Sequence, residues 1–317
     1  MIEYRKYQAS DLGAYKKFCL DNFGSKKHQI KSSYLDWLYD EKSKKFTVAI
    51  SDNDIVGIIH NFKAPIVING EIKVVTILHD LMVDKNFRGN VGFQLMNSAL
   101  YSDDFAILPG SVGRLARAYG RLGSKQFDSY WYKKYLIPKS FFNQKKLKNL
   151  SKYQTLAEKK ELLFGCNKGD QKGVFIERAL TNFIHSAEYV EYFQWRFLAH
   201  NAPLTFYVSD TSGKSTALFI VGKKGLIPYL RIFYINAESK SVLDRMVGFI
   251  EKYASNIGIP IILFTSFECS PPENSNYRPY NPMPVSFVFS KRKSFDFVPE
   301  VPSFCSDISF EGLNPYE

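Results

Sequence analysis

The sequence is poor in the features that mark several protein classes. Cysteine is scarce, with 4 residues in 317, and no two of them form a Cys-x-x-Cys pair. This spacing indicates neither a disulfide framework nor a zinc site. No stretch approaches the ~20 consecutive apolar residues of a membrane span, and residues 1–6 have no apolar core of a signal peptide. We therefore expect a cytoplasmic protein whose thiols, Cys19, Cys166, Cys269 and Cys305, are buried and reduced.

Acidic residues are also few relative to basic ones. The chain carries 42 Lys and Arg against 31 Asp and Glu, a formal net charge of +11. This excess favours an anionic partner, and coenzyme A, nucleotide sugars and tRNA are all anionic. Many of the lysines are scattered through residues 138–160, a pattern typical of a solvated linker, so direct nucleic-acid binding is not expected. Apolar residues make up 45% of the chain, enough to fill the cores of two domains.

The most informative stretch is residues 77–96, ILHDLMV followed by DKNFRGNVGFQLM. It predicts an apolar strand, a bend rich in Gly and Asn, and then a helix with Val91, Leu95 and Leu100 on one face. Such a bend exposes backbone N–H groups at the positive end of a helix, where a phosphate binds well. Arg88 lies in this bend and adds a positive charge, so the stretch predicts an anion site.

A second motif follows at the next strand, residues 105–108, and the helix after it. In order and spacing, the two motifs resemble those of the GNAT acyltransferase superfamily. In that family, a strand ending in Val leads to Arg/Gln-x-x-Gly-x-Gly/Ala at the start of a helix, and a later helix carries Ala-x-x-Tyr-x-x-x-Gly. The matching residues here are Val83, Phe87, Arg88 and Gly89 in the first motif and Ala116, Tyr119, Leu122 and Gly123 in the second.

The first motif departs from the family pattern by one residue. Counted from Arg88, the two glycine positions fall on Val91 and Phe93, and the fit is restored by dropping one residue. Asn90 then replaces the first Gly and Gly92 is the second. Asn tolerates positive φ better than most residues, so the replacement is physically reasonable.

The resemblance implies a site for acetyl-CoA, or another acyl-CoA, as co-substrate and no metal. An amine would attack the thioester directly, and the protein would position the reactants and handle the protons. The backbone of Leu81, Met82 and Val83 would pair with the pantetheine arm. Tyr119 would be the acid that protonates the leaving thiolate, unless it is only a core residue. The pyrophosphate would be held by Arg88, Gly89, Asn90, Val91, Gly92 and Phe93.

The general base is less clearly indicated. His79 and Asp80 lie just before the pantetheine segment, and strand alternation points them to opposite faces, so only one would reach the acceptor. We favour Asp80 as the base or the amine-binding group. His60, in a neighbouring predicted strand, is a further candidate, and water could also carry the proton.

The layout predicts an α/β (α+β) fold with two tandem GNAT-like domains, each a mixed, mostly antiparallel sheet flanked by helices. We expect an N-terminal domain over residues 1–137, a basic linker over 138–160 and a C-terminal domain over 161–317. In the first domain we expect a strand at 127–132 that closes the sheet. We also expect helices at 12–19 and 32–38, strands at 2–7, 46–50 and 55–60, and a hairpin at 65–68 and 73–77 around Asn69-Gly70.

The second half repeats features of the first. Trp37 and Trp195 each stand 15 residues before the aspartate of a Ser-Asp turn. Residues 228–235 resemble the CoA strand, but the bend after them contains Glu238 and no Gly. Because a carboxylate there would repel phosphate, we expect no CoA site in this domain.

The prediction of the substrate rests only on the resemblance to a family layout. Tandem chains of this kind resemble bacterial N-acetyltransferases of amino sugars, which predicts a nucleotide-linked amino sugar of surface-polysaccharide biosynthesis as the acceptor. The alternatives are a Fem-like aminoacyl transferase, although the coiled-coil insertion of that group is absent, and a non-catalytic GNAT-like binding protein. The oligomeric state stays open.

Overall fold

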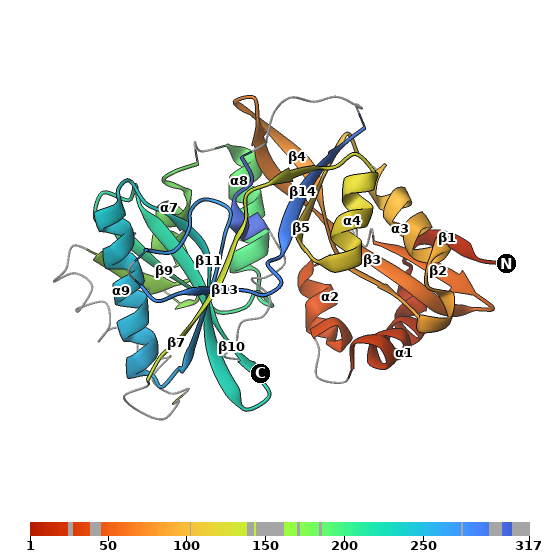
Figure 1. The fold of residues 1–317 in the computed structure, drawn as a ribbon, viewed down its shortest axis with the longest axis horizontal. Helices are drawn as coiled ribbons and strands as arrows, with labels where there is room; N and C mark the ends of the chain where they lie inside the picture. Colours follow the sequence, from red (N-terminus) through yellow and green to blue (C-terminus); the bar gives the residue numbers. More distant parts are fainter. Residues whose placement is uncertain are drawn as a thin grey trace. The chain divides into compact units, whose positions relative to one another are not determined.

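The computed structural model describes residues 1–24, 28–38, 46–101, 103–137, 143, 162–169, 172–183, 186–273, 275–291 and 300–305 (Figure 1). The chain forms two compact units. The first unit combines Met1–Phe127 with Val285–Glu300, and the second combines Asp128–Pro284 with Val301–Glu317. Within the described residues, each unit contains one 7-stranded sheet.

The first sheet has the order β1-β2-β3-β4-β5-β14-β6. Every neighbouring pair is antiparallel except β4 and β5, which are parallel. The predicted hairpin at Asn69-Gly70 is confirmed, and both residues have positive φ, as a type I′ turn requires. The strands are β1 (Glu3–Lys6), β2 (Thr47–Ser51), β3 (Asp54–Ile68), β4 (Glu71–Val83), β5 (Phe105–Ser111), β6 (Lys125–Phe127) and β14 (Val285–Ser290).

The strands predicted at 55–60 and 65–68 are in fact one strand, β3. Its pairing with β4 continues through the intervening residues to Ile68↔Glu71, with Pro65 opposite Val74. The apolar alternation is interrupted at Asn61 and Lys63, which is why the sequence pattern divides the strand.

Helices cover both faces of the first sheet. In Figure 1, α1 and α2 lie on one side, and α3 and α4 lie on the other. Gly57 of β3 lets α3 approach closely, because a Cβ at this position would lie 2.8 Å from Leu95 Cδ1. The helices are α1 (Leu12–Phe23), α2 (Ser32–Leu38), α3 (Asn90–Leu100) and α4 (Gly113–Arg121), with short 3₁₀ turns η1 (Ala9–Asp11), η2 (His28–Ile30) and η3 (Lys85–Phe87).

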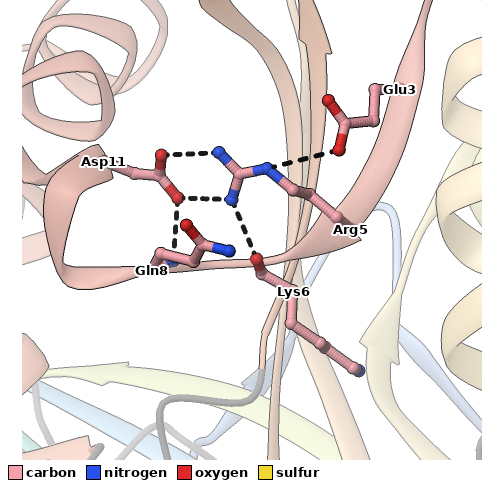
Figure 2. A network of polar contacts seen from close by, with 5 residues as sticks. All are labelled: Glu3, Arg5, Lys6, Gln8 and Asp11. Atoms are coloured by element: carbon pink, nitrogen blue, oxygen red, sulfur yellow. Dashed lines mark hydrogen bonds and ion pairs between the residues drawn. The ribbon is translucent and has the colours of Figure 1, made fainter.

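An ion pair fixes the corner between β1 and α1. The guanidinium of Arg5 donates two hydrogen bonds of 2.7 Å to the carboxylate of Asp11, whose Oδ2 also accepts from the backbone N–H of Gln8 at 2.8 Å (Figure 2). This bidentate contact lowers the pKa of Asp11. It therefore helps to set where α1 begins relative to the sheet.

The second sheet has the order β13-β7-β12-β11-β10-β9-β8, again with a single parallel pair, β11 and β12. One core of this unit lies between the sheet and α9, with Met246, Ile250 and Tyr253 of the helix fully or almost fully buried. The strands are β7 (Tyr130–Tyr135), β8 (Leu162–Cys166), β9 (Thr205–Asp210), β10 (Thr216–Lys224), β11 (Ile227–Asn236), β12 (Ile261–Ser266) and β13 (Arg278–Pro279). The helices are α7 (Lys172–Leu180), α8 (Ala187–Phe193), the π-helical turn η5 (Gln194–Leu198), α9 (Lys240–Asn256) and the 3₁₀ turn η6 (Ser303–Cys305).

Two strands lie in a different sheet from the one that the sequence predicts. Of the residues predicted to close the first domain, 127–132, Phe127 ends β6 of the first sheet, whereas Tyr130, Trp131 and Tyr132 belong to β7, which pairs with β12 of the second sheet. β14, which comes much later in the chain, joins the first sheet between β5 and β6. Alternation predicts a strand but not its partner, because several strands offer a similar apolar face. The predicted linker, 138–160, lies outside the described residues apart from Asn143.

Three of the four predicted buried thiols are buried, and Cys269 is partly exposed. None of the helices in the described ranges has both the length and the apolar composition needed to cross a membrane.

Candidate functional site

The centre of the candidate site is the place where β4 and β5 separate. Their parallel pairing consists of Thr76↔Ala106 and Ile77↔Ile107. Beyond Ile77, β4 continues to Val83 paired with β3, while β5 pairs with β14. In the described part of the chain, the edge of β4 that includes Leu81 and Met82 therefore has no strand beside it. An edge of this kind can accept an extended ligand through backbone hydrogen bonds.

A β-bulge reshapes β4 just before this edge. The register shifts between Ile58 and His60 of β3, and Asp80 adopts a left-handed conformation with φ of 50°. One extra residue on β4 interrupts the alternation of side chains. The expectation that His79 and Asp80 point to opposite faces is therefore wrong, because both side chains turn toward the same group of residues.

That group is a buried polar cluster, which we call the Asp80 cluster: Tyr15, Tyr34, His60, His79 and Asp80. Asp80 Oδ2 accepts from the Tyr34 hydroxyl at 3.1 Å and lies 3.1 Å from His60 Nδ1 and 3.4 Å from His79 Nδ1. The other nitrogen of His60, Nε2, lies 3.1 Å from the Tyr15 hydroxyl. Two strands and two helices thus place five polar side chains in contact.

Sequence reasoning identified the three residues on the strands and missed the two tyrosines. Tyr15 lies on α1 and Tyr34 on α2, where their aromatic rings fit the apolar face of an amphipathic helix equally well. A tyrosine on such a face carries a hydroxyl that needs a partner once it is buried. This need for a hydrogen-bond partner was the only hint in the sequence, and it does not say which residue the partner is.

The electrostatics of the cluster favour an ionised Asp80. Burial opposes ionisation, but the hydrogen bonds from His60 and then His79 outweigh it and hold the pKa of Asp80 well below its usual value. Its side chain is 15% exposed, compared with 4% for His79 and none for His60. Asp80 is thus a stable anion and the member of this trio most accessible to a ligand.

The same trio could also hold a metal ion. One ligand atom from each of His60, His79 and Asp80 lies within 4.8 Å of the others. Two imidazoles and a carboxylate form a donor set that suits divalent transition metals. In the structure, the Asp80 carboxylate already contacts the Nδ1 atoms of both histidines directly.

The bend after β4 leads directly to the first turn of α3. Gly89 is the N-cap residue, with φ of 105°, and no side chain caps the helix. Its first α-helical hydrogen bond runs from Phe93 N to Gly89 O at 3.2 Å. The N–H groups of Asn90, Val91 and Gly92 have no hydrogen-bond acceptor in the described part of the chain, as is usual for a helix start without a side-chain cap. The left-handed residue is Gly89 rather than Asn90, so the tolerance of Asn for positive φ is not used.

The charged residues of this bend are exposed. Arg88 and Lys85 are both open to solvent, and the Asp84 carboxylate accepts a hydrogen bond from Asn86 N at 2.9 Å within the bend. Two cations therefore stand close to the uncapped helix start. Their charge adds to that of the helix dipole in attracting a polyanion.

The corresponding helix of the second unit is closed by its own residues. Ser239 caps α9, with its hydroxyl accepting from Val242 N at 3.3 Å, and Glu238 precedes it. The 3₁₀ turn η6 also packs against β11, since the Phe304 ring lies 5.0 Å from that of Tyr234. Ser303 donates from its backbone N–H to Glu268 at 2.8 Å. β11 separates from β12 after Ile232↔Phe264, much as β4 separates from β5, so the strand edge has a counterpart in the second unit. The uncapped helix start has none at this position, because Ser239 caps α9.

Tyr119 lies near the C-terminal end of α4 with its ring in the core of the first unit. The ring is 3% exposed and stands 6.1 Å from that of Phe287. Burial raises the pKa of its phenol, which is therefore protonated at neutral pH. No hydrogen-bond partner of its hydroxyl is found among the described residues.

Comparison with known proteins identifies the fold. No protein-family model and no curated protein sequence matches the chain. Solved structures do. A GCN5-related N-acetyltransferase from Anabaena variabilis ATCC 29413 has a TM-score of 0.57 at 14% identity, over 91% of this chain and 72% of its own. One from Kribbella flavida has a TM-score of 0.55 at 12% identity, over 92% of this chain and 72% of its own.

A eukaryotic enzyme gives a similar result. N-Myristoyltransferase from Saccharomyces cerevisiae, solved with bound myristoyl-CoA, has a TM-score of 0.58 at 10% identity, over 91% of this chain and 79% of its own. At these identities the likeness concerns the fold. The chain has the GNAT fold across both units, which confirms the fold predicted from the two motifs.

Proposed function

We propose that the protein is an acetyl-CoA-dependent N-acetyltransferase acting on the primary amine of a small anionic acceptor, a nucleotide-linked amino sugar of surface-polysaccharide biosynthesis. The observation that carries the proposal is the juxtaposition, along one stretch of chain, of an open β4 edge and an uncapped α3 start flanked by cations. The GNAT-fold neighbours support acyl transfer. The myristoyl-CoA in one of them supports a CoA thioester as the donor.

The two halves of this stretch match the two parts of coenzyme A. The pantetheine arm carries amide groups that would pair with the backbone of Leu81, Met82 and Val83 as an added strand. The pyrophosphate would lie on the N–H groups of Asn90, Val91 and Gly92, with Gly89 and Phe93 bordering them and Arg88 neutralising charge. The thioester would then lie beside β4, toward the Asp80 cluster.

The chemistry assigned to the chain is direct aminolysis of the thioester, which needs no metal. Asp80, an anion at neutral pH, would bind the acceptor as its ammonium ion and orient it. The ammonium has to lose one proton before it can attack, and its nitrogen loses a second as the amide forms. The Asp80 cluster would accept these protons in turn and release them to water, since Asp80 alone is too weak a base and two imidazoles contact it. As the C–N bond forms and the C–S bond breaks, Tyr119 would protonate the thiolate, and water would then return a proton to Tyr119.

Acetyl-CoA is expected to bind once per chain. Isothermal titration calorimetry should give one site, because in the second unit Ser239 caps α9 and Glu238 stands beside the helix start. Replacing Arg88 with Glu should weaken binding roughly tenfold, since an anion would then face the pyrophosphate. Arg245→Glu on α9 is the matched control and should leave the affinity unchanged. Two equivalent sites, or none, would contradict the proposal.

The acceptor is tested by a screen with acetyl-CoA and mass spectrometry. Nucleotide-linked amino sugars, free amino sugars, amino acids, polyamines and peptides should be compared at equal concentration. We expect turnover on amino sugars, with the nucleotide-linked forms preferred because the net charge of +11 favours an anionic substrate. Turnover confined to peptide lysines or aminoacyl-tRNA would contradict the sugar assignment. Binding of acetyl-CoA without any turnover would favour a non-catalytic protein.

A further inference from the structure

One end of the second sheet carries a hairpin that extends past its neighbours. β10 pairs with β9 only as far as Ile220↔Thr205, and β11 pairs with β12 only from Tyr229↔Ile261. Beyond these points, β10 and β11 pair with each other alone, as far as Lys224↔Ile227, and their hairpin reaches away from the sheet (Figure 1). Gly225, with φ of 65°, forms the two-residue turn together with Leu226.

The tip of this hairpin is apolar and fully accessible. Leu226 is 97% exposed and Ile227 is 53% exposed. The end of β7 lies at the same end of the sheet, because Tyr135 pairs with Ile261 and Ile261 pairs with Tyr229. There, Tyr135 is 62% exposed and Ile137 is 93% exposed. Four of the large apolar side chains most exposed in the described residues therefore gather at one end of one sheet.

Basic residues surround these apolar side chains. Lys223 and Lys224 are exposed next to the hairpin turn, and the Lys133 ammonium lies 5.9 Å from the centre of the Tyr135 ring. Arg278 of β13 pairs with Lys133 and is exposed. Glu251, an acidic residue of α9, is in an ion pair of 2.7 Å with Lys134. We call the set Lys133, Tyr135, Ile137, Lys223, Lys224, Leu226 and Ile227 the basic apolar edge.

We propose that the basic apolar edge docks the protein onto an anionic lipid surface. Leu226 and Ile227 would enter the headgroup region, where apolar side chains gain from leaving water, and the lysines would remain at the level of the lipid phosphates. A patch that combines exposed aliphatic side chains with cations matches such a surface, since neither feature alone gives stable attachment. This peripheral contact involves no membrane-spanning helix and is independent of the proposed acyl transfer.

Vesicle co-sedimentation of the full chain tests this inference. The wild type should sediment with phosphatidylcholine vesicles that contain about a third phosphatidylglycerol, and not with pure phosphatidylcholine. Binding should fall as salt rises, because the lipid charge is screened. The double variant Leu226→Ser/Ile227→Ser should bind about tenfold more weakly, and Lys224→Gln should bind more weakly by a smaller factor.

Two control variants separate this contact from general effects of charge and apolarity. Lys214→Gln changes an exposed lysine at the opposite end of β10, and Leu20→Ser removes a half-exposed aliphatic side chain from α1. Both should bind like the wild type. Equal binding by the hairpin double variant, or by neutral vesicles, would overturn the proposal. Loss of a dimer in the double variant by light scattering, without lipid binding by the wild type, would instead assign the edge to a second copy of the chain.

Discussion

Replacing Tyr119 with Phe should lower the turnover number by roughly 10²- to 10⁴-fold, the usual contribution of a general acid. The ring and its packing against Phe287 would stay, and only the proton that could reach the leaving thiolate would be lost. The Michaelis constant for acetyl-CoA should change far less, because the hydroxyl acts when the C–S bond breaks. Steady-state kinetics with the acceptor found by the screen would measure both constants.

The turnover number separates this role from a purely structural one. Among the described residues, the Tyr119 hydroxyl has no hydrogen-bond partner, so its removal should barely change the melting temperature. A Tyr119 that only fills the core would keep its packing as Phe, and turnover of the folded protein would then be near normal. Tyr101→Phe, at a half-exposed tyrosine of the same unit, is the matched control and should change neither quantity.

The sequence predicted the parts of this molecule that depend on short-range chemistry. The Asn69-Gly70 turn, the strand-bend-helix at Val83 and Gly89, and the helix that carries Tyr119 are each specified by a few neighbouring residues. Positive φ, an uncapped helix start and apolar periodicity can be recognised without knowing what packs against them. The fold followed because two such motifs occur in a characteristic order.

The parts that could not be predicted depend on residues far apart in the chain. From the sequence, Asp80 is predicted to be one residue of a regular alternating strand. Only the pairing of β4 with β3 shows the bulge that turns its side chain toward His60. Tyr15 and Tyr34 join the cluster from separate helices, 45 positions before His60 and 46 before Asp80, and nothing in the intervening sequence indicates that they meet. The pairing of β7 with the second sheet and of β14 with the first could not be predicted for the same reason, since the alternation of a strand does not identify the strand it pairs with.

Replacing Asp80 with Asn should impair both catalysis and stability, because one carboxylate serves both. The variant keeps the size of the side chain but loses the charge that would hold the acceptor ammonium and pair with two imidazoles. We expect kcat/KM for the amine acceptor to fall by about 10²- to 10⁴-fold, while the affinity for acetyl-CoA stays close to that of the wild type. Asp54→Asn, which breaks only the exposed ion pair with Lys17, is the matched control and should have normal kinetics.

The pH dependence of stability tests the same carboxylate independently of any substrate. The pKa of Asp80 is lowered in the folded state, so the folded protein holds the ionised form more favourably than the unfolded chain does. Its stabilisation is therefore complete above the unfolded pKa of about 4 and is lost as pH falls through the folded pKa.

At neutral pH, Asp80→Asn should lower the free energy of unfolding by roughly 3 kcal/mol, as for other broken buried ion pairs. Denaturant unfolding of both proteins at several pH values should show this difference shrinking below about pH 4. If the difference in the free energy of unfolding between the two proteins stayed constant down to the lowest pH measured, Asp80 would stabilise the fold through packing and not through its charge. The cluster could not then act as the anion that binds the amine.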